Sequence, residues 1–185
     1  MLSLLADFEN AGGSFVPCAP VLGGASEAGR LQLRLGDAEQ TLVGANIVIN
    51  SAGLNASEVA LSIEGIHRDS IPKAYYAIGH YFTMAGRNPF SHLIYPVAGH
   101  GHLGIHVTLD MANQVRFGPD IQWLDEIDYT FDESRKDDFV NAVARYYPTI
   151  RSREVTPAYT GIRPKSEEHT SELQSHHDLV CRLLL

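Results

Sequence analysis

Apolar side chains recur along the chain with two different periods, which predict helices and strands in an α/β (α+β) fold. The strict alternation at Leu31–Leu35 is typical of a half-buried strand, and the aromatic-rich run Tyr75–Met84 is also strand-like. Helical spacing predicts one helix over residues 2–8 and another over residues 132–147, capped by Asp132. Further extended segments are expected at residues 41–43, 93–97, 103–109 and 157–164.

The run Ala45–Asn50 is apolar on both faces, the pattern of a fully buried strand that is parallel to its neighbours. It ends in three small residues, Ser51, Ala52 and Gly53, and a helix with Ser57 as its N-cap is expected to follow. Small side chains at the carboxyl end of a strand let a ligand approach the backbone, and open α/β sheets bind ligands there. A tight strand-to-helix turn without a ligand is the alternative.

Composition limits the classes of protein that the chain can belong to. Its 185 residues, 44% of them hydrophobic, suffice for a core but not for two full-sized domains. A formal net charge of −8 disfavours a nucleic-acid binder, and no apolar stretch is long enough for a transmembrane segment. Two cysteines, Cys18 and Cys181, provide neither a disulfide scaffold nor a Cys-rich zinc site. We therefore expect a soluble, cytoplasmic protein.

The two ends of the chain differ from the rest. The string Ser166–Ser175 follows neither apolar period and is similar to a translated sequencing adapter, and it begins the last twenty residues, 166–185. This tail is therefore expected to be non-native and disordered. The chain also opens inside a predicted helix without a capping residue, so Met1 is expected to be an internal methionine of a longer gene.

Histidines and glycines cluster in one segment. The string Gly99–Gly104 has the spacing of a dinucleotide-binding loop, but a strand follows it where such a loop needs a helix, so a hairpin turn is predicted. His100, His102 and His106 have no convergent cysteine or paired carboxylate, so no metal site is expected. His106 and Thr108 share the polar face of a predicted strand, and this face is directed either at a ligand or at solvent.

One arginine, Arg163, lies between Gly161 and Pro164 in an otherwise apolar extended segment. An arginine in this setting suits bidentate binding of a carboxylate, and a structural ion pair fits the pattern equally well. The aromatic residues of the second half are expected to pack within the sheet, with stacking on a cofactor as the alternative. They are Tyr75, Tyr76, Tyr81, Phe82 and Tyr95.

Six motifs follow one another at residues 47–54 (IVINSAGL), 79–82 (GHYF), 93–97 (LIYPV), 103–110 (LGIHVTLD), 116–120 (RFGPD) and 160–165 (TGIRPK). In this order they resemble the FAD-dependent oxidoreductases of the D-amino-acid-oxidase superfamily, and L-2-hydroxyglutarate dehydrogenases most of all. The resemblance implies a partial FAD-binding domain at residues 1–71 and a substrate-binding sheet with a covering helix at residues 72–150. Residues 151–165 would then form a strand that returns toward the FAD-binding domain.

The resemblance also implies site residues. It places FAD contacts at Val21, Ser51, Ala52 and Gly53. It places substrate contacts at Tyr95, His106, Thr108 and Arg163. Arg163 would bind the substrate carboxylate, and His106 is the candidate base for the hydroxyl proton while the hydride at C2 passes to the flavin.

The family's N-terminal dinucleotide fingerprint and its closing glycine-containing stretch are both missing from this chain, so we expect a fragment. The parent enzyme is expected to oxidise a small 2-hydroxy acid, with a quinone as electron acceptor, as a protein without a transmembrane segment that is at most peripheral at a membrane. One alternative is an amino-acid or amine oxidase of the same fold. The other is a truncated, non-catalytic chain with no function of its own, because a large anionic cofactor would lack its phosphate-binding loop.

Overall fold

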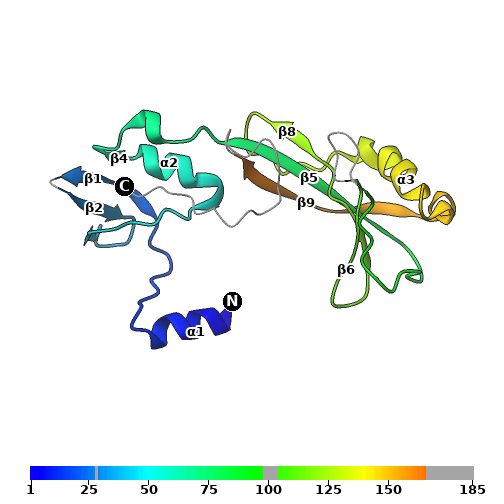
Figure 1. The fold of residues 1–185 in the computed structure, drawn as a ribbon, viewed down its shortest axis with the longest axis horizontal. Coiled ribbons are helices and arrows are strands. Elements are labelled where there is room, and N and C mark those ends of the chain that lie inside the picture. Colours follow the sequence, from blue (N-terminus) through cyan, green and yellow to red (C-terminus); the bar gives the residue numbers. More distant parts are fainter. Residues whose placement is uncertain (28, 98–103, 166–185) are drawn as a thin grey trace. The chain divides into compact units, whose positions relative to one another are not determined.

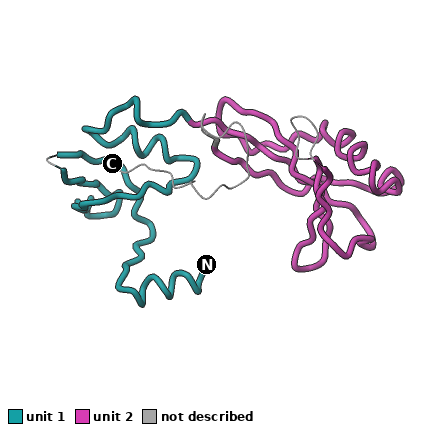
Figure 2. The backbone as a smooth tube through the Cα atoms, viewed as in Figure 1, with its two compact units in different colours: residues 1–73, 172–185 teal, residues 74–171 magenta. Residues whose placement is uncertain are grey.

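The computed structural model describes residues 1–27, 29–97 and 104–165. The chain forms two compact units that divide between Lys73 and Ala74, drawn in two colours in Figure 2. Strands and helices occur in both units (Figure 1), which gives the mixed α/β class expected from the sequence. That the first unit binds a cofactor and the second a substrate stays a prediction.

The first unit contains a four-stranded sheet in the order β3-β2-β1-β4. Its strands β1 and β2 pair antiparallel, as do β2 and β3, whereas β1 and β4 pair parallel. The strands span Val21–Glu27 (β1), Arg30–Leu35 (β2), Leu42–Ala45 (β3) and Ile63–Glu64 (β4). The helices span Leu2–Asn10 (α1), Gly53–Asn55 (η1), Ala56–Leu61 (α2) and Arg68–Ser70 (η2). The expected N-terminal helix and the alternating strand at 31–35 are thus confirmed.

The predicted buried strand at Ala45–Asn50 is wrong. Only Ala45 belongs to a strand, and no described residue pairs with positions 47–50. Ile47 is 67% exposed and Ile49 is 83% exposed. A strand that is apolar on both faces requires neighbouring strands and layers on either side. Without such neighbours among the described residues, this run stays an exposed extended segment.

The capping role predicted for Ser57 is also wrong. The helical segment begins earlier, with η1, and α2 follows with Asn55 as its N-cap residue. The Ser57 hydroxyl instead donates a hydrogen bond to the carbonyl oxygen of Pro72 at 3.0 Å. Ser57 therefore fastens the helix to the segment that ends the first unit.

The second unit is organised around one long strand, β5 (Tyr75–Met84), as predicted. Strand β9 (Val155–Lys165) pairs antiparallel along the whole of β5 (Figure 1), from Tyr75 opposite Lys165 to Met84 opposite Val155. The other edge of β5 is shared by β8 (Gln122–Leu124) and β7 (Val115–Phe117), and β6 (Val107–Leu109) pairs with β7. Its helices span Glu133–Arg135 (η3), Lys136–Ala144 (α3) and Pro148–Ser152 (η4).

The core of the second unit lies between the sheet and α3. Phe82 of β5 is fully buried, with its ring centroid 4.6 Å from that of Phe139 in α3 and 5.1 Å from that of Phe131. Phe139 and Val143 face inward as the helical spacing predicted, and Asp132 accepts a hydrogen bond from the backbone N–H of Ser134 at 3.0 Å. The remaining buried members of this core are Met84, Val107, Val115, Phe117, Ile150 and Val155.

Two of the extended segments predicted in this unit are shorter than expected. In the segment 93–97 only Ile94 pairs, through an antiparallel bridge to Val107, while Tyr95 is 60% and Val97 is 97% exposed. Pro96 offers no backbone N–H for a ladder, which explains why pairing does not continue. The alternating strand begins at Val107, so His106 precedes it. The hairpin turn predicted at 99–104 falls largely on residues 98–103, outside the described residues.

Candidate functional site

The sheet of the second unit has a polar face on the side away from its core. Along β5, Phe82 and Met84 point into the core, so Tyr81 and Thr83 point to the opposite face. Tyr81 lies directly opposite Tyr159 of β9, and their rings stack with centroids 4.4 Å apart and planes 17° apart. A stacked tyrosine pair therefore occupies the middle of this face.

Arg163 extends the same face along β9. Residues 159, 161 and 163 alternate onto one side of the strand, so the Arg163 side chain lies on the side of the tyrosine pair. Arg163 is exposed, and no hydrogen bond or ion pair joins its guanidinium to another residue in the described part of the chain. The structural ion pair that the sequence left open for Arg163 is therefore absent among those residues.

Electrostatic interactions connect the side chains of Tyr81, Tyr159 and Arg163. Burial raises the pKa of Tyr81, and the neighbouring phenols of Tyr159 and Tyr95 raise it further, whereas the positive charge of Arg163 lowers it. The phenol of Tyr81 therefore interacts electrostatically with Tyr95, Tyr159 and Arg163. We call these four residues the tyrosine–arginine cluster.

His106 contacts one member of this cluster, Tyr95. The imidazole of His106 and the ring of Tyr95 have centroids 4.4 Å apart, tilted by 53°. Val107, the next residue, is fully buried in the core, so His106 and Thr108 on either side of it point to the polar face, as the alternation predicted. The Thr108 hydroxyl donates a long hydrogen bond of 3.5 Å to the carbonyl oxygen of Arg116.

The residues expected to contact FAD lie in the first unit. Ser51, Ala52 and Gly53 are all exposed, and Gly53 has a φ of +60°, which favours glycine. A Cβ added at Gly53 would meet no atom within 4 Å. The side chain of Asn50 holds the turn: it donates to the carbonyl oxygen of Ala56 at 2.7 Å and accepts from the N–H of Ala52 at 3.2 Å. A large ligand can approach this backbone closely, so the turn fits a cofactor contact. Val21, half-buried, begins β1 opposite Leu35.

Sequence reasoning missed a buried polar group next to Tyr81. His80 is 1% exposed, and the Asp120 carboxylate accepts hydrogen bonds from its backbone N–H at 2.7 Å and from its Nδ1 at 3.0 Å. Arg135 donates to the other oxygen of Asp120, and among the described residues none bonds to the Nε2 of His80. Asp120 lies between β7 and β8, on the edge of β5 where neither of these two strands pairs with residues 79–81. The motifs GHYF and RFGPD contain His80 and Asp120, but nothing in their spacing indicates this contact.

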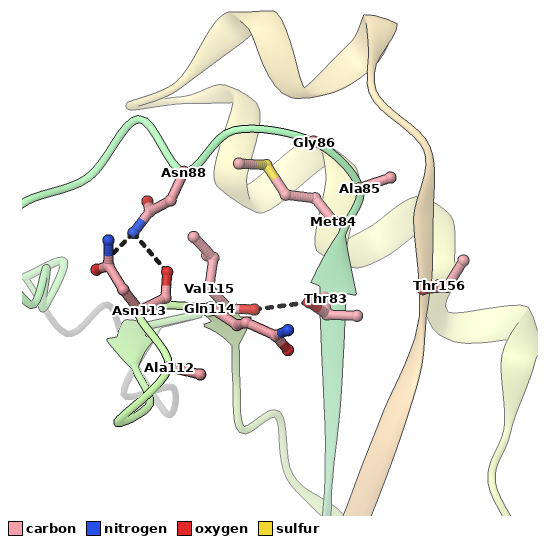
Figure 3. Close-up of a pocket in the computed structure, with 10 residues that line it drawn as sticks. All are labelled: Thr83, Met84, Ala85, Gly86, Asn88, Ala112, Asn113, Gln114, Val115 and Thr156. Atoms are coloured by element: carbon pink, nitrogen blue, oxygen red, sulfur yellow. Dashed lines mark hydrogen bonds between the residues drawn. The ribbon is translucent and has the colours of Figure 1, made fainter.

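A pocket of about 430 Å³ lies at the end of β5 that carries Thr83 and Met84 (Figure 3). Within it the amide of Asn88 donates to the carbonyl oxygen of Asn113 at 3.0 Å, and the hydroxyl of Thr83 donates to the carbonyl oxygen of Val115 at 2.8 Å. None of the residues that line it has an ionisable side chain. This pocket therefore offers no acid, base or charge for catalysis.

Among the residues described, no group of three or more His, Cys, Asp or Glu side chains is placed to hold a metal ion; His100 and His102 lie outside that part. Within the same part of the chain, no helix has the length and apolar character needed to cross a bilayer.

Comparison with known proteins tests the resemblance drawn from the six motifs. L-2-hydroxyglutarate dehydrogenase, mitochondrial, from Arabidopsis thaliana is 39% identical over 132 residues, which are 65% of this chain and 27% of that protein. The crystal structure of glycine oxidase from Geobacillus kaustophilus matches with a TM-score of 0.66 at 16% identity, over 96% of this chain and 44% of the oxidase. The chain thus spans well under two thirds of either protein. The model of the family described as DAO, FAD dependent oxidoreductase, matches residues 1–180, so the chain belongs to this family of flavoproteins.

Proposed function

We propose that the protein acts as an FAD-dependent oxidoreductase that oxidises a small 2-hydroxy acid similar to L-2-hydroxyglutarate. The observation that carries this proposal is Arg163, an exposed guanidinium without a partner among the described residues, beside a stacked tyrosine pair. The 39% identity to a protein named for L-2-hydroxyglutarate supports the choice of substrate.

Arg163 binds the substrate carboxylate. A guanidinium presents paired N–H donors that match the two oxygens of a carboxylate, and it keeps its charge at any physiological pH. Its backbone is fixed by pairing with Ala77 in β5, so its position is set by the longest pair of strands in the unit. A rigid strand holds a binding group more accurately than a loop does.

Oxidation of a 2-hydroxy acid removes a hydride from C2 and a proton from the hydroxyl group. FAD supplies the hydride acceptor when it is bound. The proton is left to the protein, and His106 is the candidate base because imidazole exchanges protons near neutral pH. The ring of Tyr95 packs on the His106 ring, with centroids 4.4 Å apart. Thr108 points to the same face and is a candidate for orienting the substrate.

The contacts with FAD are assigned to Ser51, Ala52 and Gly53, whose exposed backbone fits a close approach, and to Val21. A quinone as electron acceptor stays a prediction. Cytoplasmic localisation also stays a prediction, and the relative from Arabidopsis thaliana is named as mitochondrial.

The test is a steady-state assay of the flavin-reconstituted protein with an artificial electron acceptor. The substrates are L-2-hydroxyglutarate, its D enantiomer, glycine, and D- and L-amino acids. We expect turnover with the L-2-hydroxy acid. Arg163→Ala should raise KM by about ten- to a hundredfold, as expected for loss of a charge-assisted hydrogen bond. The matched control is Arg151→Ala, because Arg151 is also exposed and, within the part of the chain that the structure describes, bonds only the side chain of Asn141.

Turnover of amino acids in place of the hydroxy acid would assign the protein to the amino-acid oxidases of the same fold. An unchanged KM in Arg163→Ala would remove the carboxylate-binding role. Failure to retain FAD would contradict the enzymatic proposal as a whole.

A further inference from the structure

Two glycines lie directly opposite each other on the polar face of the second sheet, and their surroundings differ. Gly79 of β5 pairs with Gly161 of β9. A Cβ at Gly79 would lie 2.6 Å from the Cβ of Pro119, so that side is filled. A Cβ at Gly161 would meet no atom within 4 Å. The space beside Gly161 is therefore open, whereas the space beside Gly79 on the same face is filled.

Hydrogen-bond donors to which no described residue bonds lie on both sides of this open space. Tyr159 precedes Gly161 by two residues and Arg163 follows by two, so all three alternate onto one face. The Cα atoms of Tyr159 and Arg163 are about 13 Å apart, four steps of about 3.3 Å along a strand. In the described part of the chain, the hydroxyl groups of Tyr81 and Tyr159 make no hydrogen bond.

A guanidinium at one end, two phenols at the other and a residue without a side chain between them suit an elongated anion with polar groups at both ends. An acid with a single carboxylate would use only Arg163. A short dicarboxylic acid would also use the phenols, since hydroxyl groups donate well to a carboxylate. The open space at Gly161 leaves room for the carbon chain that joins the two ends.

We propose that Tyr81, Tyr159 and Gly161 determine specificity for a dicarboxylic 2-hydroxy acid, with one carboxylate on Arg163 and the distal carboxylate on the two phenols. This inference rests on the proposed function, because it takes Arg163 as the anchor. It adds the residues that select the length and the second charge of the substrate.

The experiment measures binding to the chain itself, without FAD and without turnover. Dissociation constants for L-2-hydroxyglutarate and L-lactate are taken from chemical-shift changes of the backbone amides of β5 and β9 in NMR titrations, because these probes are present in every variant. The variants are Arg163→Ala, the double variant Tyr81→Phe/Tyr159→Phe, and Gly161→Ala. Gly44→Ala is the control for the glycine, because a Cβ at Gly44 of β3 also meets no atom within 4 Å. Tyr129→Phe is the control for the hydroxyl groups, because Tyr129 is 53% exposed and Tyr159 is 50% exposed.

We expect L-2-hydroxyglutarate to bind about tenfold more tightly than L-lactate, as two added hydrogen bonds would give. The double tyrosine variant should reduce this ratio to about one without weakening lactate. Gly161→Ala should weaken 2-hydroxyglutarate by about tenfold, the effect of one methyl group placed in a substrate site. Both control variants should bind like the unchanged chain.

Three other outcomes would contradict this inference, and one of them would also contradict the proposed function. If both acids bind equally and both depend on Arg163, the carboxylate anchor stands and the specificity proposal is wrong. If neither affinity depends on Arg163, the proposed function and this inference are both wrong. A folded chain that binds neither acid also overturns the two-ended site.

Discussion

Asp120 closes the gap in the second sheet, and its replacement by alanine is expected to lower the free energy of unfolding by about 3–5 kcal/mol. The carboxylate is 9% exposed and accepts from two donors of His80, the backbone N–H at 2.7 Å and Nδ1 at 3.0 Å. Each donor left buried without a partner costs about 1–3 kcal/mol. Arg135 is 25% exposed and can turn to water, so its lost ion pair adds at most about 1 kcal/mol.

Equilibrium unfolding in urea measures this effect. The chain contains one tryptophan, Trp123 of β8, which lies opposite Ala77 of β5, so its fluorescence reports on the second sheet. Asp128→Ala is the matched control: this exposed carboxylate is hydrogen-bonded to Thr130 at the surface, and its loss should cost about 0.5 kcal/mol. If Asp120→Ala lies within about 1 kcal/mol of the control, water satisfies His80 and the reasoning from burial is wrong.

Three further results are expected. Gly79→Ala should lower the free energy of unfolding in urea by about 1–3 kcal/mol, because its Cβ would lie 2.6 Å from the Cβ of Pro119. Gly161→Ala should leave this free energy unchanged, and equal losses in the two variants would contradict the reasoning. Burial raises the pKa of Tyr146 to about 12, so the unfolded chain loses this proton first and stability should fall between about pH 10 and pH 12; Tyr146→Phe should reduce this loss. Arg163→Ala should raise the pKa of Tyr81 further in an ultraviolet titration, because the guanidinium lowers this pKa. An unchanged pKa would mean that Arg163 and Tyr81 do not interact.

The sequence by itself determined the elements whose apolar periods are long and regular. The alternation at 31–35 became β2, the aromatic run at 75–84 became β5, and the helical spacing after Asp132 became η3 and α3. In these segments the local period already decides which side chains face the core. The six motifs also indicated the family, because each motif is a string of consecutive residues that can be recognised without knowing any tertiary contact.

Tertiary structure decided the rest, for a physical reason. The run at 47–50 has the composition of a buried strand, but burial requires partners, and the described residues provide none. Register places Tyr81 opposite Tyr159 and Gly79 opposite Gly161, and these pairs come from segments about eighty residues apart in the chain, beyond the reach of any local period. The contact of His80 with Asp120 depends on the gap between β7 and β8, which exists only once both of these strands pair with the same edge of β5.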